Sequence, residues 1–185
     1  MFGMLPQALV VAGKEMKINS DFRVAIRIFN ACNDVNADDI MKTRFMIETL
    51  YQHPEDITDM GEAVKKALWY LNLGSDQEEA KPATRMYDWN QDEQIIFSSV
   101  NKVAGRETRE SDYIHFWTFM GYFQEIGEGI LSYVIGIRDK KSKNKKLTKE
   151  EMSFYMKNKD LIDIKKQYTE REKAEMDAVA ELIGV

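Results

Sequence analysis

The segment from residue 113 to residue 123 constrains the fold most, because it is apolar nearly all the way round a predicted helix. Helical spacing gives it two apolar faces: Tyr113, Phe116, Trp117, Met120 and Phe123 on one, and Ile114, Phe119 and Tyr122 on much of the other. Such a helix lies at the centre of a core or hides one face against another chain. We therefore expect the first face to be mostly core, and part of the second to form an exposed patch of the kind that marks association sites.

The composition is that of one ordinary globular domain, with or without an appendage. The chain has 185 residues, of which 44% are hydrophobic and 31% charged, and its net charge of −5 argues against a dedicated nucleic-acid binder. Cys32 is the single cysteine, which excludes an intramolecular disulfide and fits a reducing compartment. The N-terminal apolar run has no basic leader, and no apolar stretch approaches the roughly 20 residues of a membrane span. We expect a cytoplasmic protein.

The remaining patterns predict a mainly α fold: a multi-helix bundle with a short N-terminal β-hairpin and a charged C-terminal helical extension. Residues 5–18 predict the hairpin, with its turn at Ala12-Gly13-Lys14. Spacing, capping boxes and glycine stops predict helices at 22–32, 37–52, from about 58 to Gly74, from Asp88 to Gly105, from Ser111 onward, at 130–138, from Thr148, and from Thr169 to nearly Gly184. Residues 75–86 read as a connector. The domain organisation we expect is a core over 1–139, a basic linker over 140–147, and charged helices over 148–185.

Each helical stripe also predicts which residues face inward. Cys32, at the end of the first stripe, is expected to be a small buried hydrophobe. The other residues predicted to face inward include Phe22, Ala25, Ile26, Phe29, Ile40, Ile47, Leu50, Tyr51, Met60, Val64, Ala67, Leu68, Leu71, Trp89, Ile96, Val100 and Val103.

A dense basic segment follows the apolar helices. From Arg138 to Lys149 there are seven basic residues against Asp139, a local charge of +6. The segment is open to three interpretations: a solvated loop, a contact with acidic groups of this protein or of a partner, or a phosphate-binding site. No aromatic residue lies between Asp139 and Lys149 to stack on bases. We therefore favour the first two interpretations over nucleic acid.

Residues that perform chemistry are scarce. The two histidines, His53 and His115, are far apart, and no metal-binding, phosphate-binding or nucleophile motif is present. His115 is expected to be partly buried and hydrogen-bonded to a neighbour. The sequence thus predicts no catalytic residue, no metal ligand and no cofactor, and it favours a non-enzymatic protein.

The chain resembles the bacteriophage gene-product-fifteen family, which occurs in tailed phages and prophages of Gram-positive hosts. The residues that carry the resemblance include Asp88-Trp89 with Asp92, Ile96-Phe97-Ser98, Asn101 to Gly105, Arg109, Asp112-Tyr113, His115 to Phe119, Ile135 to Arg138 with its lysines, and Asn158 to Leu161. The resemblance is most specific through residues 88–138. Phe116 departs from the family pattern, because a tryptophan is expected at this position, directly before Trp117.

This resemblance implies a tail assembly chaperone that coats the tape measure protein until tail-tube protein polymerises around it. It implies action in the host cytoplasm, absence from the mature virion, and homo-oligomerisation, with no membrane. The predicted partner-binding residues are Phe116, Trp117, Phe119, Tyr122, Arg138, Lys140, Lys141, Lys143, Lys145 and Lys146. Two alternatives remain: a nucleic-acid-associated phage module using the lysines, and a structural tail protein retained in the virion.

Overall fold

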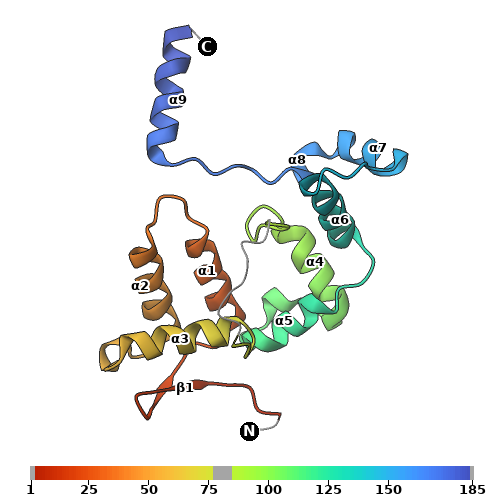
Figure 1. Ribbon diagram of the computed structural model, residues 1–185. Helices are drawn as coiled ribbons and strands as arrows, with labels where there is room; N and C mark the ends of the chain where they lie inside the picture. The colour runs from red at the N-terminus through yellow and green to blue at the C-terminus, as the bar shows by residue number, and fades with distance from the viewer. Residues whose placement is uncertain (1–2, 77–84, 184–185) are drawn as a thin grey trace.

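The structure, a computed structural model, describes residues 3–76 and 85–183. Most of the connector predicted at 75–86 lies outside the described residues, as do the side chains of 178–183. The fold is mainly α with one N-terminal hairpin, which confirms the predicted fold class (Figure 1).

The hairpin pairs β1 (Ala8–Val11) with β2 (Lys14–Lys17) in antiparallel register, so that Val11 faces Lys14 across the turn. Ala12 and Gly13, at the turn, both have positive φ, 49° and 77°. That conformation matches the twist of the flanking strands, which is why two-residue hairpin turns adopt it. The buried face of the hairpin packs on α3 and carries Leu9, Val11 and Met16. The predicted hairpin and its position against the helices are confirmed.

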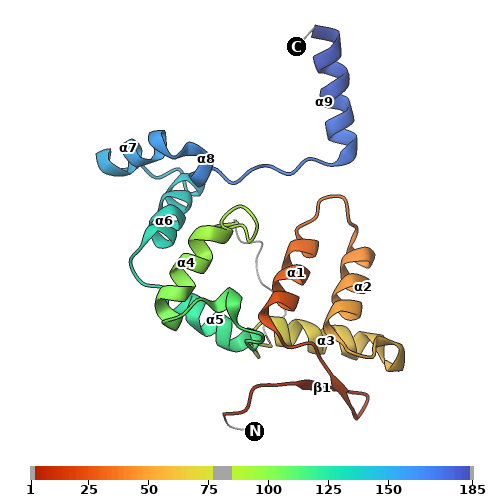
Figure 2. The ribbon, with the colours of Figure 1, turned by 180° about the vertical axis from the view of Figure 1, so that it is seen from behind.

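Three helices form one side of the core. α1 (Phe22–Cys32) and α2 (Asp39–Leu50) lie side by side, and α3 (Met60–Leu71) runs across their ends (Figures 1 and 2). The short turn η1 (Pro54–Asp56) precedes α3. An aspartate side chain caps each helix start by accepting a hydrogen bond from a first-turn backbone N–H. α3 ends at Leu71, and Leu73 (φ 57°), not Gly74, is the first left-handed residue after its cap; Gly74 (φ 83°) follows directly, so the predicted stop lies one residue earlier than expected.

The second side is built from α4 (Glu93–Ala104), η2 (Thr108–Glu110), α5 (Phe116–Gln124) and α6 (Ile130–Ser142). α5 packs against both α4 and α1 and so joins the two sides. Two backbone hydrogen bonds join the N-terminal ends of α5 and α1: Phe116 N donates to Ser20 O at 2.8 Å, and Phe22 N donates to Ile114 O at 3.0 Å. The rings of Phe22 and Phe119 stack with their centroids 4.2 Å apart. The aromatic helix is therefore the centre of the core.

The C-terminal region continues with α7 (Lys149–Lys157), α8 (Lys159–Ile162) and α9 (Glu170–Ile183). α8 packs on α6, where Val134, Ile137 and Ile162 form a small second core. The two capping boxes predicted in this region are present, at Thr148 with Glu151 and at Thr169 with Glu172. A third, predicted at Asp88 with Gln91, is incomplete, because the Gln91 side chain bonds to Asp163 O and Lys165 N instead. α9 stands apart from the body in Figure 1.

Several burial and boundary predictions are wrong. Residues predicted to face inward but exposed in the structure are Cys32, Ile40, Met60, Leu68 and Val103. They lie at helix ends or on the edges of stripes, and helices at the rim of a bundle have neighbours on only part of their surface. α4 begins at Glu93, not at Asp88, because Asp88 caps a separate turn. α6 extends to Ser142, four residues beyond its predicted end, so part of the predicted linker is helical.

Candidate partner-binding surface

The aromatic residues of α5 are largely unavailable to a partner. Phe116 and Phe119, both predicted to bind a partner, are only 1% and 0% exposed. The expected exposed patch is therefore absent at Phe119, and also at Ile114, because α1 and α4 cover the helix from two sides. Trp117 and Tyr122 are half-buried. Their assignment to a partner stays a prediction.

Trp117 is held by its neighbours. Its indole N–H donates to Tyr70 O at 2.9 Å, and its ring lies 5.5 Å from that of Trp69, centroid to centroid. Gly74 lies directly under this pair, and a Cβ there would stand 3.1 Å from Trp117 Cη2. The exposed part of Trp117 is thus fixed in orientation.

His115 caps α5. Its Nδ1 accepts from Trp117 N at 3.0 Å, which requires a lone pair on that nitrogen, so Nε2 carries the hydrogen and donates to Pro6 O at 2.9 Å. Burial lowers the pKa of His115, and the Pro6 carbonyl opposes this only in part. The neutral ring is therefore the form that fits, and the predicted buried, hydrogen-bonded histidine is confirmed.

The lysines of the basic segment divide into two groups. Lys140, Lys141 and Lys143 pair with acidic groups of this protein, namely Glu151, Asp163 and Asp139. Lys140 also holds the pKa of Glu151 below its ordinary value. By contrast, Lys145 and Lys146 are exposed, and among the described residues no ion pair includes either of them. Of the open interpretations, contact with the protein's own carboxylates is correct for the first three lysines.

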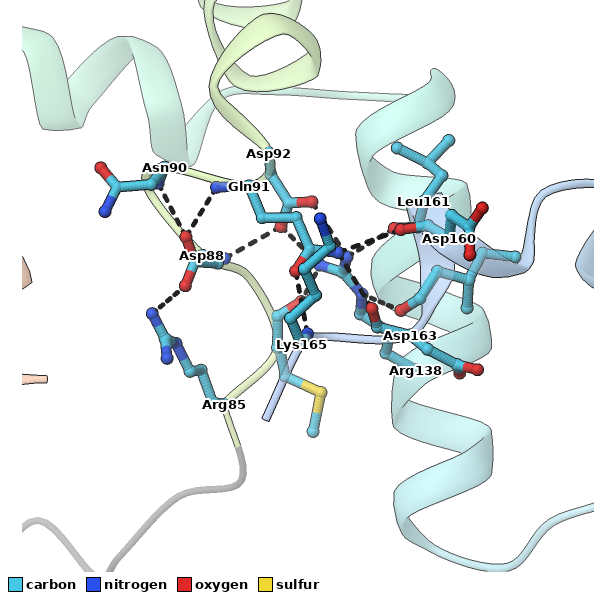
Figure 3. Close-up of polar contacts among 12 residues, drawn as sticks. Arg85, Asp88, Asn90, Gln91, Asp92, Arg138, Asp160, Leu161, Asp163 and Lys165 are labelled. Carbon is cyan, nitrogen blue, oxygen red and sulfur yellow. Dashed lines mark hydrogen bonds and ion pairs between the residues drawn. The ribbon is translucent and has the colours of Figure 1, made fainter. Parts of the chain in front are cut away.

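Arg138 was predicted to contact a partner, but it is buried. Its guanidinium makes a two-pronged ion pair with Asp92, with Nη1–Oδ2 and Nη2–Oδ1 distances of 2.5 and 2.9 Å. Its other three N–H groups donate to the carbonyls of Ile162, Met86 and Leu161, at 2.7, 3.0 and 2.8 Å. All five donors of the guanidinium are therefore used inside the protein (Figure 3). The prediction for Arg138 is wrong, because its charge serves the fold.

Further hydrogen bonds extend this network and fasten the C-terminal segment to the turn before α4. Asp92 also accepts from Asp88 N at 2.9 Å, and the Asp88 side chain accepts from Gln91 N and pairs with Arg85. The Gln91 side chain donates to Asp163 O at 2.9 Å and accepts from Lys165 N at 2.9 Å (Figure 3). The segment that carries α7 and α8 is thus anchored at a defined place on the body.

α7 presents an exposed face that the sequence analysis missed. Met152 and Met156, one turn apart, are 46% and 71% exposed, and exposed Lys149 and Ser153 share their side of the helix. The opposite side is fixed, since Phe154 meets the ring of Tyr133 at 5.0 Å and the Tyr155 hydroxyl donates to Asp163 at 2.9 Å. We define the α7 surface as Lys145, Lys146, Lys149, Met152, Met156 and Lys157. The signal for it was the i, i+4 methionine pair between lysines.

Within the described residues, no group of three or more histidine, cysteine, aspartate or glutamate side chains is placed to hold a metal ion. No helix in the described part of the chain has both the length and the apolar character needed to cross a bilayer.

A family model described as "Bacteriophage Gp15 protein" matches residues 3–164. The chain has no match among curated proteins and none among solved structures. The matched residues include α1–α8 and end before α9.

Proposed function

Because the chain belongs to the bacteriophage Gp15 protein family, we propose that it is a non-enzymatic tail assembly chaperone that binds a helical segment of the phage tape measure protein. It acts in the host cytoplasm and is absent from the finished particle. The observation that carries this proposal is the α7 surface, where exposed methionines lie among lysines that form no ion pair within the described part of the chain.

The side chains of the α7 surface indicate what kind of tape measure segment it would bind. Methionine side chains are flexible and polarisable, and they accommodate varied apolar partners. Two of them one turn apart suit the apolar stripe of another helix. Lys145, Lys146, Lys149 and Lys157 lie just before, within and at the end of α7 and favour acidic residues beside that stripe. The expected ligand is an acidic amphipathic helix.

The Arg138 network supports the proposal that a short helix acts as a binding platform. An isolated helix of nine residues is marginal in water. Here α7 is capped at Thr148 and packed on Tyr133 through Phe154, and the segment behind it is tied to Arg138 and Gln91. A preordered surface loses less conformational entropy on binding and binds more tightly.

Co-expression with tape measure protein from the same phage tests the proposal. We expect this protein to keep the tape measure soluble and to co-purify with it. The variant Met152→Ser/Met156→Ser should abolish co-purification while leaving the fold intact. The matched control is Ile40→Ser/Met41→Ser on α2, which removes two residues of similar exposure, 80% and 58%. Equal retention of the tape measure by both variants would rule out the α7 surface.

The nucleic-acid alternative is less favoured, because three lysines of the basic segment are engaged with the protein's own carboxylates. A gel-shift titration at low and moderate salt tests it. Steeply salt-dependent binding that Lys145→Gln/Lys146→Gln removes would support it.

A structural virion protein would use the same α7 surface and differ only in its fate. Mass spectrometry of purified particles decides between the two, since a chaperone should be missing from them.

A further inference from the structure

We propose that α9 of one copy docks on the α7 surface of a second copy. The inference rests on the proposed function, since it assigns a second ligand to the same surface. α9 then competes with the acidic helix of the partner for the same α7 surface.

The first observation is that α9 is exposed wherever its side chains are described, over residues 170–177. The side chains from Arg171 to Asp177 are all exposed, including that of Met176. A helix whose described side chains are all exposed gains stability from a partner. The sequence gives α9 a stripe of Ala174, Ala178 and Leu182.

The second observation concerns charge. α9 carries five acidic residues and two basic ones, a net charge of −3. The α7 surface contributes four lysines, and Lys145 and Lys146 are in no ion pair among the described residues. The exposed apolar face of α2, with Ile40, Met41 and Phe45, is another surface on which a helix could dock. That helix and its cap carry Asp38, Asp39 and Glu48 against Lys42 and Arg44, a net charge of −1. The four lysines of the α7 surface therefore attract an acidic helix more strongly.

The third observation is the place of α9 within its own chain. Glu170 N donates to Asn36 Oδ1 at 2.9 Å, which fixes the start of α9 beside the loop between α1 and α2. In both views α9 rises from that loop, on the opposite side of the molecule from α7 (Figures 1 and 2). With this anchor in place α9 does not meet the α7 surface of its own chain. The fitting occupant is therefore a second copy.

The dimensions agree with this arrangement. α9 has 14 residues and α7 has nine, so at the standard helical rise they are about 21 and 14 Å long. One α9 thus covers the whole of one α7. A reciprocal exchange, with each α9 on the other copy's α7, closes as a two-fold dimer.

Light scattering of the purified full-length chain, with no tape measure present, tests the proposal. We expect an apparent mass of twice the 21.5 kDa of one chain. Lys149→Glu/Lys157→Glu should reduce it to the mass of one chain, and so should Glu175→Lys/Asp177→Lys. All four substitutions in one chain should restore the dimer, because both charge signs are then reversed. Far-UV circular dichroism confirms that each variant keeps its helices.

A monomer at every concentration would overturn the proposal. So would a dimer that survives Lys149→Glu/Lys157→Glu but is lost in Ile40→Ser/Met41→Ser, because α9 would then dock on α2. A chain that stays monomeric while still co-purifying with the tape measure would refute the exchange alone. A charge-dependent dimer that never captures the tape measure would refute the proposed function instead.

Discussion

Replacing Arg138 by methionine tests whether one buried guanidinium holds the two parts of the molecule together. The substitution keeps an unbranched apolar stem and removes the guanidinium with its charge and its five hydrogen bonds. It leaves the Asp92 carboxylate, which is 0% exposed, with Asp88 N as its remaining donor among the described hydrogen bonds. The carbonyls of Met86, Leu161 and Ile162 lose the same partner.

Removing one member of a buried ion pair costs about 3–5 kcal/mol, because the other charge stays buried without compensation. That is a large part of the roughly 5–15 kcal/mol that stabilises a typical domain. Arg138→Met/Asp92→Leu removes both charges, so it should be less destabilised than the sum of the single variants by at least about 1 kcal/mol. Arg138→Lys should recover little, since an ammonium group cannot reproduce the planar fork.

Urea unfolding followed by tryptophan fluorescence and by circular dichroism measures these differences. Lys143→Met is the matched control, because it breaks a largely exposed pair with Asp139 and should cost less than about 0.5 kcal/mol. The reasoning fails if Arg138→Met costs less than about 1 kcal/mol. It also fails if the double variant loses as much as both single variants together.

Three further predictions concern single positions. Burial lowers the pKa of His115, so the unfolded chain binds the proton more tightly, and the free energy of unfolding should fall as the pH drops below about 6.5. Urea titrations between pH 5.5 and 7.5 measure this fall, and His115→Asn, which keeps a capping side chain, should abolish it. Gly74→Ala should destabilise more than Gly105→Ala in thermal melts: both have positive φ and a strain of about 1–2 kcal/mol, but only at Gly74 does the new Cβ press on Trp117. An equal loss of stability in the two variants would show that the Trp117 side chain moves aside without cost. Thr148→Ala should cost about 1 kcal/mol and speed amide exchange within α7, as the lost cap frees its first turn; unchanged exchange there would contradict the capping role.

The features that sequence predicts well here are those set by a few neighbouring residues. The hairpin turn at Ala12-Gly13 and the capping box at Thr148 depend on local backbone conformation and local hydrogen bonds, and both occur as expected. The helix ends before Gly74 and Gly105 follow from the same kind of signal. No distant contact is needed to specify them.

The role of Arg138 depends on a contact with a residue distant in the sequence. Sequence alone therefore groups Arg138 with the lysines that follow it and predicts a surface contact. Its partner Asp92 lies 46 positions earlier in the chain. One signal was present: Arg138 follows Val134 by one turn and Ile137 directly, so it lies on the buried side of α6. An arginine that is buried on such a stripe is almost always paired, so this position pointed to a partner inside the protein.

The burial of Phe116 and Phe119 is also a tertiary property. A helix that is apolar on both sides fits either a core or an interface, and periodicity alone does not distinguish them. Phe22 of α1 and Phe97 of α4 supply the contacts that decide for the core. Periodicity likewise does not separate the exposed Met152 and Met156 of α7 from Phe154, which packs on Tyr133.

Hydrogen exchange of the Glu175→Lys/Asp177→Lys chain, in which no second copy covers α7, tests the α7 surface most directly when the chain alone is compared with its complex with the tape measure protein. We predict slowed amide exchange over Lys149–Lys157 in the complex, with residues 143–148 also protected and α2 unchanged. Protection confined to α5 or α2, with α7 exchanging as in the free chain, would contradict the account.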